Sequence, residues 1–468
     1  MLEGLRITEV KLTKLPKSSI MRMEPEFYIS GQMKYAKYKK AGEITTFVQY
    51  GTSKELNEIK EGYPILRLNE FDSSFISEPT KYCSLIDEDD YNSLKLQKND
   101  VLICRTNGNP KLVGRSALVP KNYEYAFASY LFRVRPDRHY IYPATLVSFL
   151  NSKYGRMEIE KYSMVGNQAN FSPAKFREIS IPLFSRDFNE TIEVLTYNAF
   201  ENIDRSNTKY KEVEDYLSDL LGLSNIKGNN NAMTKRVSDS FLISGRLDAE
   251  YYLPQYDDLF ELLEQFETKK LGSIVTIQKS VEPGSCYYQT KGIPFVRVAD
   301  LSIFGLKEPS IYLDKDAFAD VMRPKGNTIL MSKDGSVGIA YKVTEDINCI
   351  TSSAILHLFV NDNSILPDYL TLVINSQVVQ MQAERDAGGS IIQHWKPSEI
   401  SDVIIPILPM EEQIRISSEV QESFKLRHES KRLLGVAKQA VEIAISEDEE
   451  KAIEYIKENG ESLLGRQI

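Results

Sequence analysis

The stretch at residues 143–160, PATLVSFLNSKYGRMEIE, occurs again in diverged form at residues 367–384, PDYLTLVINSQVVQMQAE. At a constant offset of 224 residues, a proline, a leucine, an asparagine, a serine, a methionine and a glutamate are identical. Self-similarity at a fixed offset is the sequence signature of a repeated structural unit. We therefore predict that the chain contains one module twice.

The repeat extends to both sides of this stretch. Residues 63–67 pair with residues 293–297 at an offset of 230, so the offset drifts and then recovers. Gaps that cancel are what loop insertions and deletions in a duplicated domain would leave. The further matches at an offset of 224 are Arg22 with Arg246, Glu26 with Glu250, Tyr28 with Tyr252, Val113-Gly114 with Val337-Gly338, Pro173 with Pro397, Ile181 with Ile405 and Pro182 with Pro406.

Each copy is predicted to be a mixed α+β domain followed by a long helix. Short apolar runs bounded by Asn, Gly and Pro, such as residues 101–104 and 131–134, are typical of strands. Residues 187–221 and 410–445 have apolar side chains at alternating steps of three and four, which indicates helices about 50 Å long. Their seams favour a mutual antiparallel pair; the alternative is that each stripe packs on its own domain.

This pattern divides the chain into six predicted segments. They are a first domain over residues 1–185, a first long helix over 186–224, a flexible linker over 225–237, a second domain over 238–408, a second long helix over 409–446 and an acidic C-terminal tail over 447–468. The linker is polar and contains Gly-Asn-Asn-Asn. We expect the tail to be a solvated surface helix or a frayed end.

Composition indicates a soluble globular protein. The 468 residues are 42% hydrophobic and 26% charged, which suits several packed domains. The first 15 residues lack the apolar run of a signal peptide, and nowhere do about 18 apolar residues follow one another. The four cysteines have no paired spacing, which argues against structural zinc and disulfides and favours the reducing cytosol.

Charge is distributed unevenly along the chain. Residues 91–186 contain fifteen Lys or Arg and six Asp or Glu, whereas residues 187–222 contain three and nine. A basic globular segment beside an acidic helix indicates a surface for polyanions next to a surface for proteins; the alternative is ordinary fluctuation of charge. Residues 245–405 have a net charge of -8, so charge alone does not establish nucleic-acid binding.

Catalytic motifs are missing. The four histidines are not spaced as metal ligands, and neither a phosphate-binding GxxxxGK[ST] loop nor a GxSxG elbow occurs. Asn109-Pro-Lys-Leu112 lacks the second proline and the aromatic residue of the amino-methyltransferase motif, so we interpret it as a turn. We expect no catalytic residue and no metal site in this chain.

Two polar loops occupy equivalent places in the copies and differ in chemistry. Residues 105–115, RTNGNPKLVGR, contain two arginines, a lysine and two asparagines, whereas residues 332–338, SKDGSVG, are shorter. Arg can bond both acceptors of guanine, and Asn or Gln can pair with adenine. Two differently equipped loops on one scaffold would read two different sequences; the alternative is a pair of solvent-exposed hairpin loops.

The ordered, duplicated motifs resemble the specificity subunits of type I restriction-modification systems over nearly the whole chain. The motifs that carry the resemblance are Tyr50-Gly-Thr-Ser53, Gly62-Tyr-Pro-Ile-Leu-Arg67, Asn99-Asp-Val-Leu-Ile-Cys-Arg105, Gly292-Ile-Pro-Phe-Val-Arg297, Ala299-Asp-Leu301, Gly326-Asn-Thr-Ile-Leu-Met-Ser332, Gly388-Gly-Ser-Ile-Ile-Gln393 and Ile405-Pro-Ile-Leu-Pro-Met-Glu-Glu-Gln413. One departure is Phe184-Ser-Arg-Asp-Phe-Asn189, which lacks the Pro-x-x-Glu-Gln type of opening. We therefore expect the first helix to start, or to contact partners, differently.

The resemblance implies two pseudo-twofold-related target-recognition domains separated by a coiled coil of two antiparallel helices. Each domain would read one half of a bipartite double-stranded DNA site, while the helices set the spacer and dock two methyltransferase subunits. Restriction (translocase) subunits can join such a complex. Methylation would occur on the partner, which would bind S-adenosylmethionine and flip the target base. This chain would be a non-catalytic cytoplasmic subunit without a cofactor.

Candidate DNA-contacting residues follow from the polar loops and motifs of both copies. Arg67 and Arg297 are ambiguous, because a repeated position also suits an internal salt bridge. The candidates are Thr52, Ser53, Lys54, Arg67, Asn69, Arg105, Asn107, Lys111, Arg115, Asn167 and Gln168 in the first copy, and Lys279, Arg297, Lys333, Ser336 and Gln393 in the second.

Two other functions stay open on sequence alone. One is a duplicated coiled-coil scaffold that recruits proteins without reading DNA. The other is an enzyme of unknown type, for which the sequence offers no residues to name.

Overall fold

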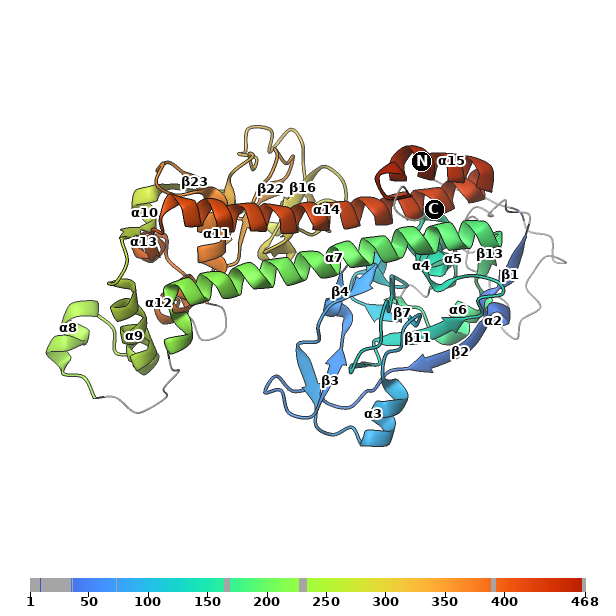
Figure 1. The fold of residues 1–468 in the computed structure, drawn as a ribbon, viewed down its shortest axis with the longest axis horizontal. Helices are drawn as coiled ribbons and strands as arrows, with labels where there is room; N and C mark the ends of the chain where they lie inside the picture. Colours follow the sequence, from blue (N-terminus) through green and yellow to red (C-terminus); the bar gives the residue numbers. More distant parts are fainter. Residues whose placement is uncertain are drawn as a thin grey trace. The chain divides into compact units, whose positions relative to one another are not determined.

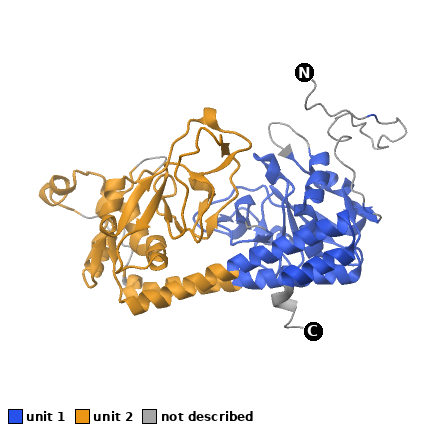
Figure 2. Ribbon diagram, turned by 90° about the horizontal axis from the view of Figure 1, so that it is seen from above, with its two compact units in different colours: residues 1–204, 427–468 blue, residues 205–426 orange. Residues whose placement is uncertain are grey.

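A computed structural model describes residues 9, 35, 37–72, 74–163, 169–226, 234–388 and 393–464. The chain divides into two compact units, shown in blue and orange in Figure 2. Unit 1 comprises residues 1–204 and 427–468, and unit 2 comprises residues 205–426. Each unit therefore combines a globular domain with parts of two long helices.

A four-stranded antiparallel sheet, in the order β2-β11-β7-β9, lies at the centre of unit 1. The side chains of each strand alternate between two hydrophobic cores, because successive side chains of a strand point to opposite faces of the sheet. Val101 and Ile103 pack with the helix α4, and Leu102 and Cys104 pack with a smaller sheet. The strands are β2 (Thr45–Tyr50), β7 (Val101–Cys104), β9 (Ser116–Leu118) and β11 (Leu131–Pro136), and α4 is Pro143–Asn151.

Unit 2 repeats this sheet in the order β15-β23-β20-β21, with the same antiparallel pairings. The alternation also recurs, since Ile329 and Met331 face one core and Leu330 the other. The matching elements are β15 (Val275–Lys279), β20 (Ile329–Ser332), β21 (Ala340–Lys342), β23 (Ile355–Val360) and the helix α11 (Pro367–Asn375). The predicted α+β duplication is confirmed.

The smaller sheets are duplicated as well, and short helices accompany them in each unit. Each unit has a three-stranded sheet with one parallel pair, β10-β3-β6 in unit 1 and β19-β16-β22 in unit 2, and an antiparallel closing pair, β1-β13 or β14-β24. In unit 1 these elements are β1 (Tyr38–Lys40), α2 (Ala41–Ile44), β3 (Tyr63–Leu66), β6 (Lys81–Cys83), α3 (Glu88–Leu94), β10 (Ala126–Phe127), α5 (Lys153–Tyr162), α6 (Pro173–Glu178) and β13 (Ser180–Pro182). In unit 2 they are α8 (Phe241–Ser244), α9 (Pro254–Leu263), β14 (Thr268–Lys270), α10 (Leu271–Ile274), β16 (Ile293–Val296), β19 (Tyr312–Leu313), β22 (Ile350–Thr351), α12 (Gln377–Asp386), α13 (Pro397–Asp402) and β24 (Ile404–Pro406).

Two of the repeated residues have a clear structural role. The Asn151 amide bonds both the N–H and the carbonyl of Ser116, at 3.1 and 2.8 Å, and so joins α4 to β9. Asn375 makes the same two bonds to Ala340, at 2.9 and 2.8 Å. Because one amide satisfies a donor and an acceptor at a strand edge, replacing it would leave both unpaired.

The long helices α7 (Arg186–Leu221) and α14 (Met410–Ser446) lie side by side and antiparallel within each unit (Figure 1). In unit 1 the Ser430 hydroxyl donates to the Ala199 carbonyl at 2.6 Å. In unit 2 the Ser423 hydroxyl donates to the Ser206 carbonyl at 2.9 Å. Ala199 to Ser206 and Ser430 to Ser423 are both steps of seven residues, in opposite directions, as in an antiparallel coiled coil. The predicted mutual pair is confirmed.

The first helix starts in the same way as the second, and the expected difference in partner contacts stays a prediction. The two helices begin at Arg186 and Met410, which are 224 residues apart. Asn189 accepts from the Tyr142 N–H at 3.0 Å, and Gln413 accepts from the Leu366 N–H at 2.9 Å. Asn189 thus joins the first turn of α7 to the start of α4, as Gln413 joins the first turn of α14 to the start of α11.

The acidic tail is a packed helix, α15 (Glu449–Leu464), and not a fully solvated or frayed end. One face is buried in the core of unit 1 through Ala452 and Ile456. Glu449 accepts hydrogen bonds from the Ser185 N–H at 3.1 Å and from the Tyr35 hydroxyl at 3.0 Å. A carboxylate at the start of α7 is also favoured by the helix dipole.

Some sequence predictions fall on residues that the structure does not describe. Residues 227–233 of the predicted linker and the matched residues Arg22, Glu26 and Tyr28 lie outside the described ranges. None of the described helices is long and apolar enough to cross a membrane. The four cysteines are free thiols, of which Cys286 alone is exposed.

Candidate nucleic-acid interface

The predicted reading loops of unit 1 converge at one edge of its central sheet. Thr52 donates through its N–H to the Phe127 carbonyl at 2.9 Å and accepts from the Ser129 N–H at 2.7 Å. Ala128, which follows Phe127, donates through its N–H to the Leu66 carbonyl at 2.9 Å, so the 66–71 segment lies beside these two segments. Segments far apart in the sequence are thus joined by main-chain hydrogen bonds.

The loop after β7 joins the same edge. Arg105 donates through its N–H to the Tyr130 carbonyl and accepts from the Phe171 N–H, both at 2.8 Å. Gly114 donates to the Cys104 carbonyl at 2.8 Å. We call the segments 51–54, 66–71, 104–116, 127–130 and 169–171 the first loop edge.

Unit 2 builds the same edge from matching segments. Ser352 donates to the Val296 carbonyl and Lys333 to the Ala354 carbonyl, each at 2.9 Å. Trp395 donates to the Lys333 carbonyl at 2.8 Å, as Phe171 does to Arg105. We call the segments 279–282, 296–301, 332–339, 351–354 and 393–395 the second loop edge.

A glycine in each loop keeps the edges alike. Gly114 and Gly338 have φ of +77° and +76°. A Cβ on Gly114 would lie 2.5 Å from Ile159 Cγ2, and a Cβ on Gly338 would lie 2.7 Å from Gln380 Nε2. The repeated Val-Gly therefore reflects a left-handed backbone packed closely on α5 in unit 1 and on α12 in unit 2.

Several first-copy candidates stand at the edge with exposed side chains, namely Ser53, Asn69 and Lys111. Thr52 is half-buried, and its main chain joins the loops. Lys54 is half-buried and paired with Asp87 at 3.5 Å and Asp90 at 3.4 Å. Ion pairing leaves Lys54 less available to a phosphate than Lys111.

Arg67 and Arg297, which the repeat makes equivalent, have different surroundings. Arg67 pairs with the buried Glu70 at 3.4 Å and donates to Thr80 at 3.0 Å. Arg297 is exposed, and no ion pair of its side chain occurs within the described ranges. The salt-bridge interpretation therefore holds for the first copy, while Arg297 stays available to a ligand.

Arg105 lies beside two tyrosines that sequence reasoning missed. Its guanidinium is 5.5 Å from the centre of the Tyr50 ring, and Tyr50 and Tyr130 are 47% and 52% exposed. Exposed aromatic rings with a stacked arginine are typical of surfaces that contact bases. The available signal was the aromatic Tyr130 directly before the predicted strand over residues 131–134.

Asn107 and Arg115 line a small cavity behind the loop, together with Leu68, Phe71, Cys104 and Leu112. The cavity measures about 30 Å³, which suits water rather than a base. Burial raises the pKa of Cys104 to about 12, so this thiol is not a ready nucleophile. The candidates Asn167 and Gln168 lie outside the described residues.

In unit 2, Lys279, Ser336 and Gln393 are exposed at the second loop edge. Lys333 is different, because its side chain is only 14% exposed and forms an ion pair with Asp334. Its backbone also bonds Ala354 and Trp395. Lys333 is therefore engaged within the loop, and its contact with DNA stays a prediction.

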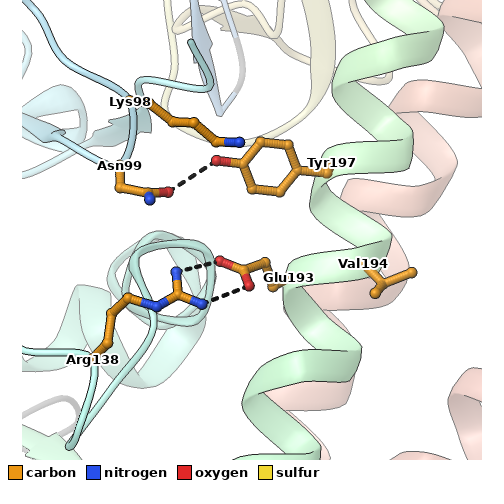
Figure 3. A pocket seen from close by; sticks show the side chains of 6 residues that line it. All are labelled: Lys98, Asn99, Arg138, Glu193, Val194 and Tyr197. Carbon is orange, nitrogen blue, oxygen red and sulfur yellow. Dashed lines mark hydrogen bonds and ion pairs between the residues drawn. The ribbon is translucent and has the colours of Figure 1, made fainter. Parts of the chain in front are cut away.

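The opposite edge of unit 1 holds a crevice of about 420 Å³ (Figure 3). Arg138 makes two bonds to Glu193 of α7, at 2.7 and 2.8 Å, and the Tyr197 hydroxyl donates to Asn99 at 2.9 Å. These bonds fasten the globular part of unit 1 to α7. The crevice contains no nucleophile with an adjacent base, and no group of metal-binding side chains occurs among the described residues.

A family model described as "Type I restriction modification DNA specificity domain" matches residues 263–431. This stretch covers most of the globular part of unit 2 and the first half of α14. The match confirms, for this part of the chain, the resemblance drawn from the motifs.

Curated relatives agree with this match. The chain is 26% identical over 183 residues to the type I restriction enzyme StySPI specificity subunit of Salmonella potsdam. It is 24% identical over 183 residues to the EcoKI specificity subunit of Escherichia coli strain K12. In both cases the match covers 37% of this chain and 38% of the relative, well under half of its length.

Two solved structures are similar over most of the chain. The HsdS subunit of Thermoanaerobacter tengcongensis is 16% identical, with 88% of this chain and 97% of that chain covered and a TM-score of 0.28. The S subunit of a type I system from M. genitalium is 11% identical, with 91% and 97% covered and a TM-score of 0.35. Both TM-scores are below 0.5, so these likenesses establish no common arrangement.

Proposed function

We propose that this chain, a member of the type I restriction-modification specificity family by its DNA specificity domain, recognises a bipartite DNA sequence through its two loop edges. Each edge would read one half-site. The chain would contribute specificity and register, and no catalytic group.

One observation supports this proposal above the others. The two loop edges have the same scaffold, with matching main-chain bonds from Arg105 to Tyr130 and from Lys333 to Ala354. Their side chains differ, since Tyr50 and Tyr130 at the first edge are replaced by Lys279 and Ala354 at the equivalent positions of the second. A constant scaffold with changed surface chemistry is what reading two different half-sites requires.

The helix pair would set the distance between the half-sites and dock the methyltransferase subunits. The 36 residues of α7 correspond to about 50 Å at 1.5 Å per residue, more than the 34–36 Å of one DNA turn. Acidic residues along α7 suit contacts with proteins better than contacts with DNA. Two methyltransferase subunits would bind, and restriction subunits could join them.

Methylation would take place on the partner. The methyltransferase would hold S-adenosylmethionine and the flipped base, and this chain would need no cofactor. Such a complex would work in the cytoplasm, where the host DNA is.

The test is to express the chain with its neighbouring methyltransferase and to sequence the methylated DNA. We expect methylation at one asymmetric motif made of two short half-sites with an unread spacer. Swapping the globular part of unit 2 for that of another specificity subunit should change one half-site alone.

Methylation without sequence preference, or unchanged by the swap, would contradict DNA reading and favour the protein-interaction scaffold. Binding of S-adenosylmethionine by the isolated chain would favour an enzyme. The isolated chain should bind DNA weakly, because residues 245–405 have a net charge of -8. Adding the methyltransferase should restore selective binding, and equal affinity alone and in complex would contradict this part.

A further inference from the structure

The second loop edge holds an aspartate–histidine pair that the sequence did not single out. Asp334 and His394 face each other across an antiparallel bridge, with 2.9 Å between Asp334 Oδ1 and His394 Nδ1. The His394 side chain is 64% exposed, whereas that of Asp334 is 21% exposed. The imidazole is thus fixed by Asp334 at Nδ1 and is otherwise open to solvent.

The first copy has other residues at the same place. There Asn170 pairs with Thr106 in the β12-β8 ladder (β12 Ala169–Asn170, β8 Thr106–Asn107). Asn170 and His394 are 224 residues apart and each directly precedes the residue, Phe171 or Trp395, whose N–H bonds the loop. The scaffold is kept and the side-chain chemistry is changed, as expected of a residue that distinguishes the two half-sites.

The second carboxylate oxygen of Asp334 is paired with Lys333. Its ammonium pairs with Oδ2, while Oδ1 faces His394. Lys333 is therefore engaged inside the loop, and among these three residues His394 is the one with an open side chain.

The carboxylate also determines which ring nitrogen of His394 is available. Asp334 can only accept, so Nδ1 donates to it, and Nε2 is the ring nitrogen left for a ligand. No bond to Nε2 occurs within the described ranges. At this place Nε2 can accept from an exocyclic amino group of adenine or cytosine in the major groove.

We propose that His394 reads a base-pair edge of the second half-site and that Asp334 is its positioning residue. This inference rests on the proposed function. It replaces Lys333 with His394 as the residue of this loop that contacts DNA.

The test uses the complex of the full chain with its methyltransferase and a DNA library randomised in both half-sites. His394→Gln should reduce discrimination at one base pair of the second half-site by roughly tenfold, with the first half-site unchanged. Asp334→Asn should reduce discrimination at the same base pair by a smaller factor. The dependence of affinity on salt should not change, because no phosphate contact is lost.

The chain offers a matched control in His139→Gln. His139 is likewise exposed, at 92%, and bonds Asp137 at 2.9 Å, but it follows the end of β11 opposite to the first loop edge. This variant should leave every base preference unchanged. Thermal unfolding and His394→Ala serve as checks that the effect does not come from misfolding.

Two outcomes would overturn the inference. One is a uniform loss of affinity for all sequences with a salt slope reduced by about one, which would make His394 a phosphate contact. The other is unaltered discrimination in both His394 variants. If the unaltered complex shows no preference in either half-site, the proposed function itself fails, which is a distinguishable result.

Discussion

Arg133 and Asp100 form a buried ion pair in unit 1, with 3.0 Å between Nη1 and Oδ2 and side chains 2% and 1% exposed. Arg133 also donates to the Lys95 carbonyl at 2.6 Å and to the Ser93 carbonyl at 2.8 Å. Burial lowers the pKa of Arg133, and the Asp100 carboxylate opposes that shift. The pair joins β11 to the segment before β7, two parts of the sheet that supports the first loop edge.

Removing the aspartate should therefore destabilise unit 1 severely. Asp100→Ala leaves the Arg133 guanidinium buried without its counter-ion, which costs about 3–5 kcal/mol in the free energy of unfolding. Urea denaturation of the full chain measures this loss. Asp137→Ala, which removes an aspartate at the surface of the same unit, is the control and should cost much less. A loss below about 1 kcal/mol for Asp100→Ala would contradict the account.

Unit 2 has a neutral residue at the equivalent position, His357, and its burial should make stability depend on pH. Burial lowers the pKa of His357 to about 4 from its usual 6.5. Between these values the unfolded chain binds a proton that the folded chain does not bind. The free energy of unfolding should therefore fall as the pH drops from 6.5 to 4, by about 3 kcal/mol at most.

Replacing this histidine should remove that part of the pH dependence. His357→Gln keeps a polar partner for the Thr351 hydroxyl, which lies 2.8 Å from Nε2, but does not titrate. Urea denaturation at pH 7 and pH 5 gives the change in the free energy of unfolding for the unaltered chain and for the variant. The exposed His428→Gln is the control. Equal pH dependence with and without His357 would count against burial as the cause.

Small side chains at the centre of the helix pair should resist enlargement. Ser206 and Ser423 are fully buried, with 3.1 Å between their hydroxyl oxygens. Ser423→Leu adds volume to a packed seam and should cost about 1–3 kcal/mol. Ser418→Leu on the exposed face of α14 is the matched control and should change thermal stability little. A comparable loss in both variants would show that packing at the buried seam does not decide the effect, since Leu is the better helix former of the two residues.

The two cations Lys111 and Arg67 of the first loop edge should behave differently when replaced. Lys111 is exposed, so Lys111→Ala should weaken DNA binding by the methyltransferase complex without altering the thermal midpoint. Unchanged binding and unchanged methylation specificity would remove the 105–115 loop from the interface.

Arg67→Ala should act on stability. Glu70, whose side chain is 4% exposed, would lose its ion pair, at a cost of about 1–3 kcal/mol. A lower thermal midpoint with unaltered half-site preference is the expected result. A changed base preference at full stability would instead make Arg67 a reading residue.

The duplication, the α+β character and the antiparallel helices could all be predicted from the amino-acid sequence. These depend on local periodicity and on residues such as Asn151 and Asn375, which repeat at a fixed offset because they join the same helix to the same strand in each copy. Patterns of this kind survive divergence, since the core must be filled in the same way twice.

Which polar residues are available at the loop edges could not be predicted, because it depends on contacts made in the folded chain. Arg67 and Arg297 match in sequence, yet the first is paired with Glu70 and the second is exposed. Lys333 is paired with Asp334, while His394, 61 residues further along, is open beside it. The helix α15 packs in the core although its composition is acidic. The physical reason is that burial and ion pairing at these places arise from main-chain bonds between distant segments, which no local pattern encodes.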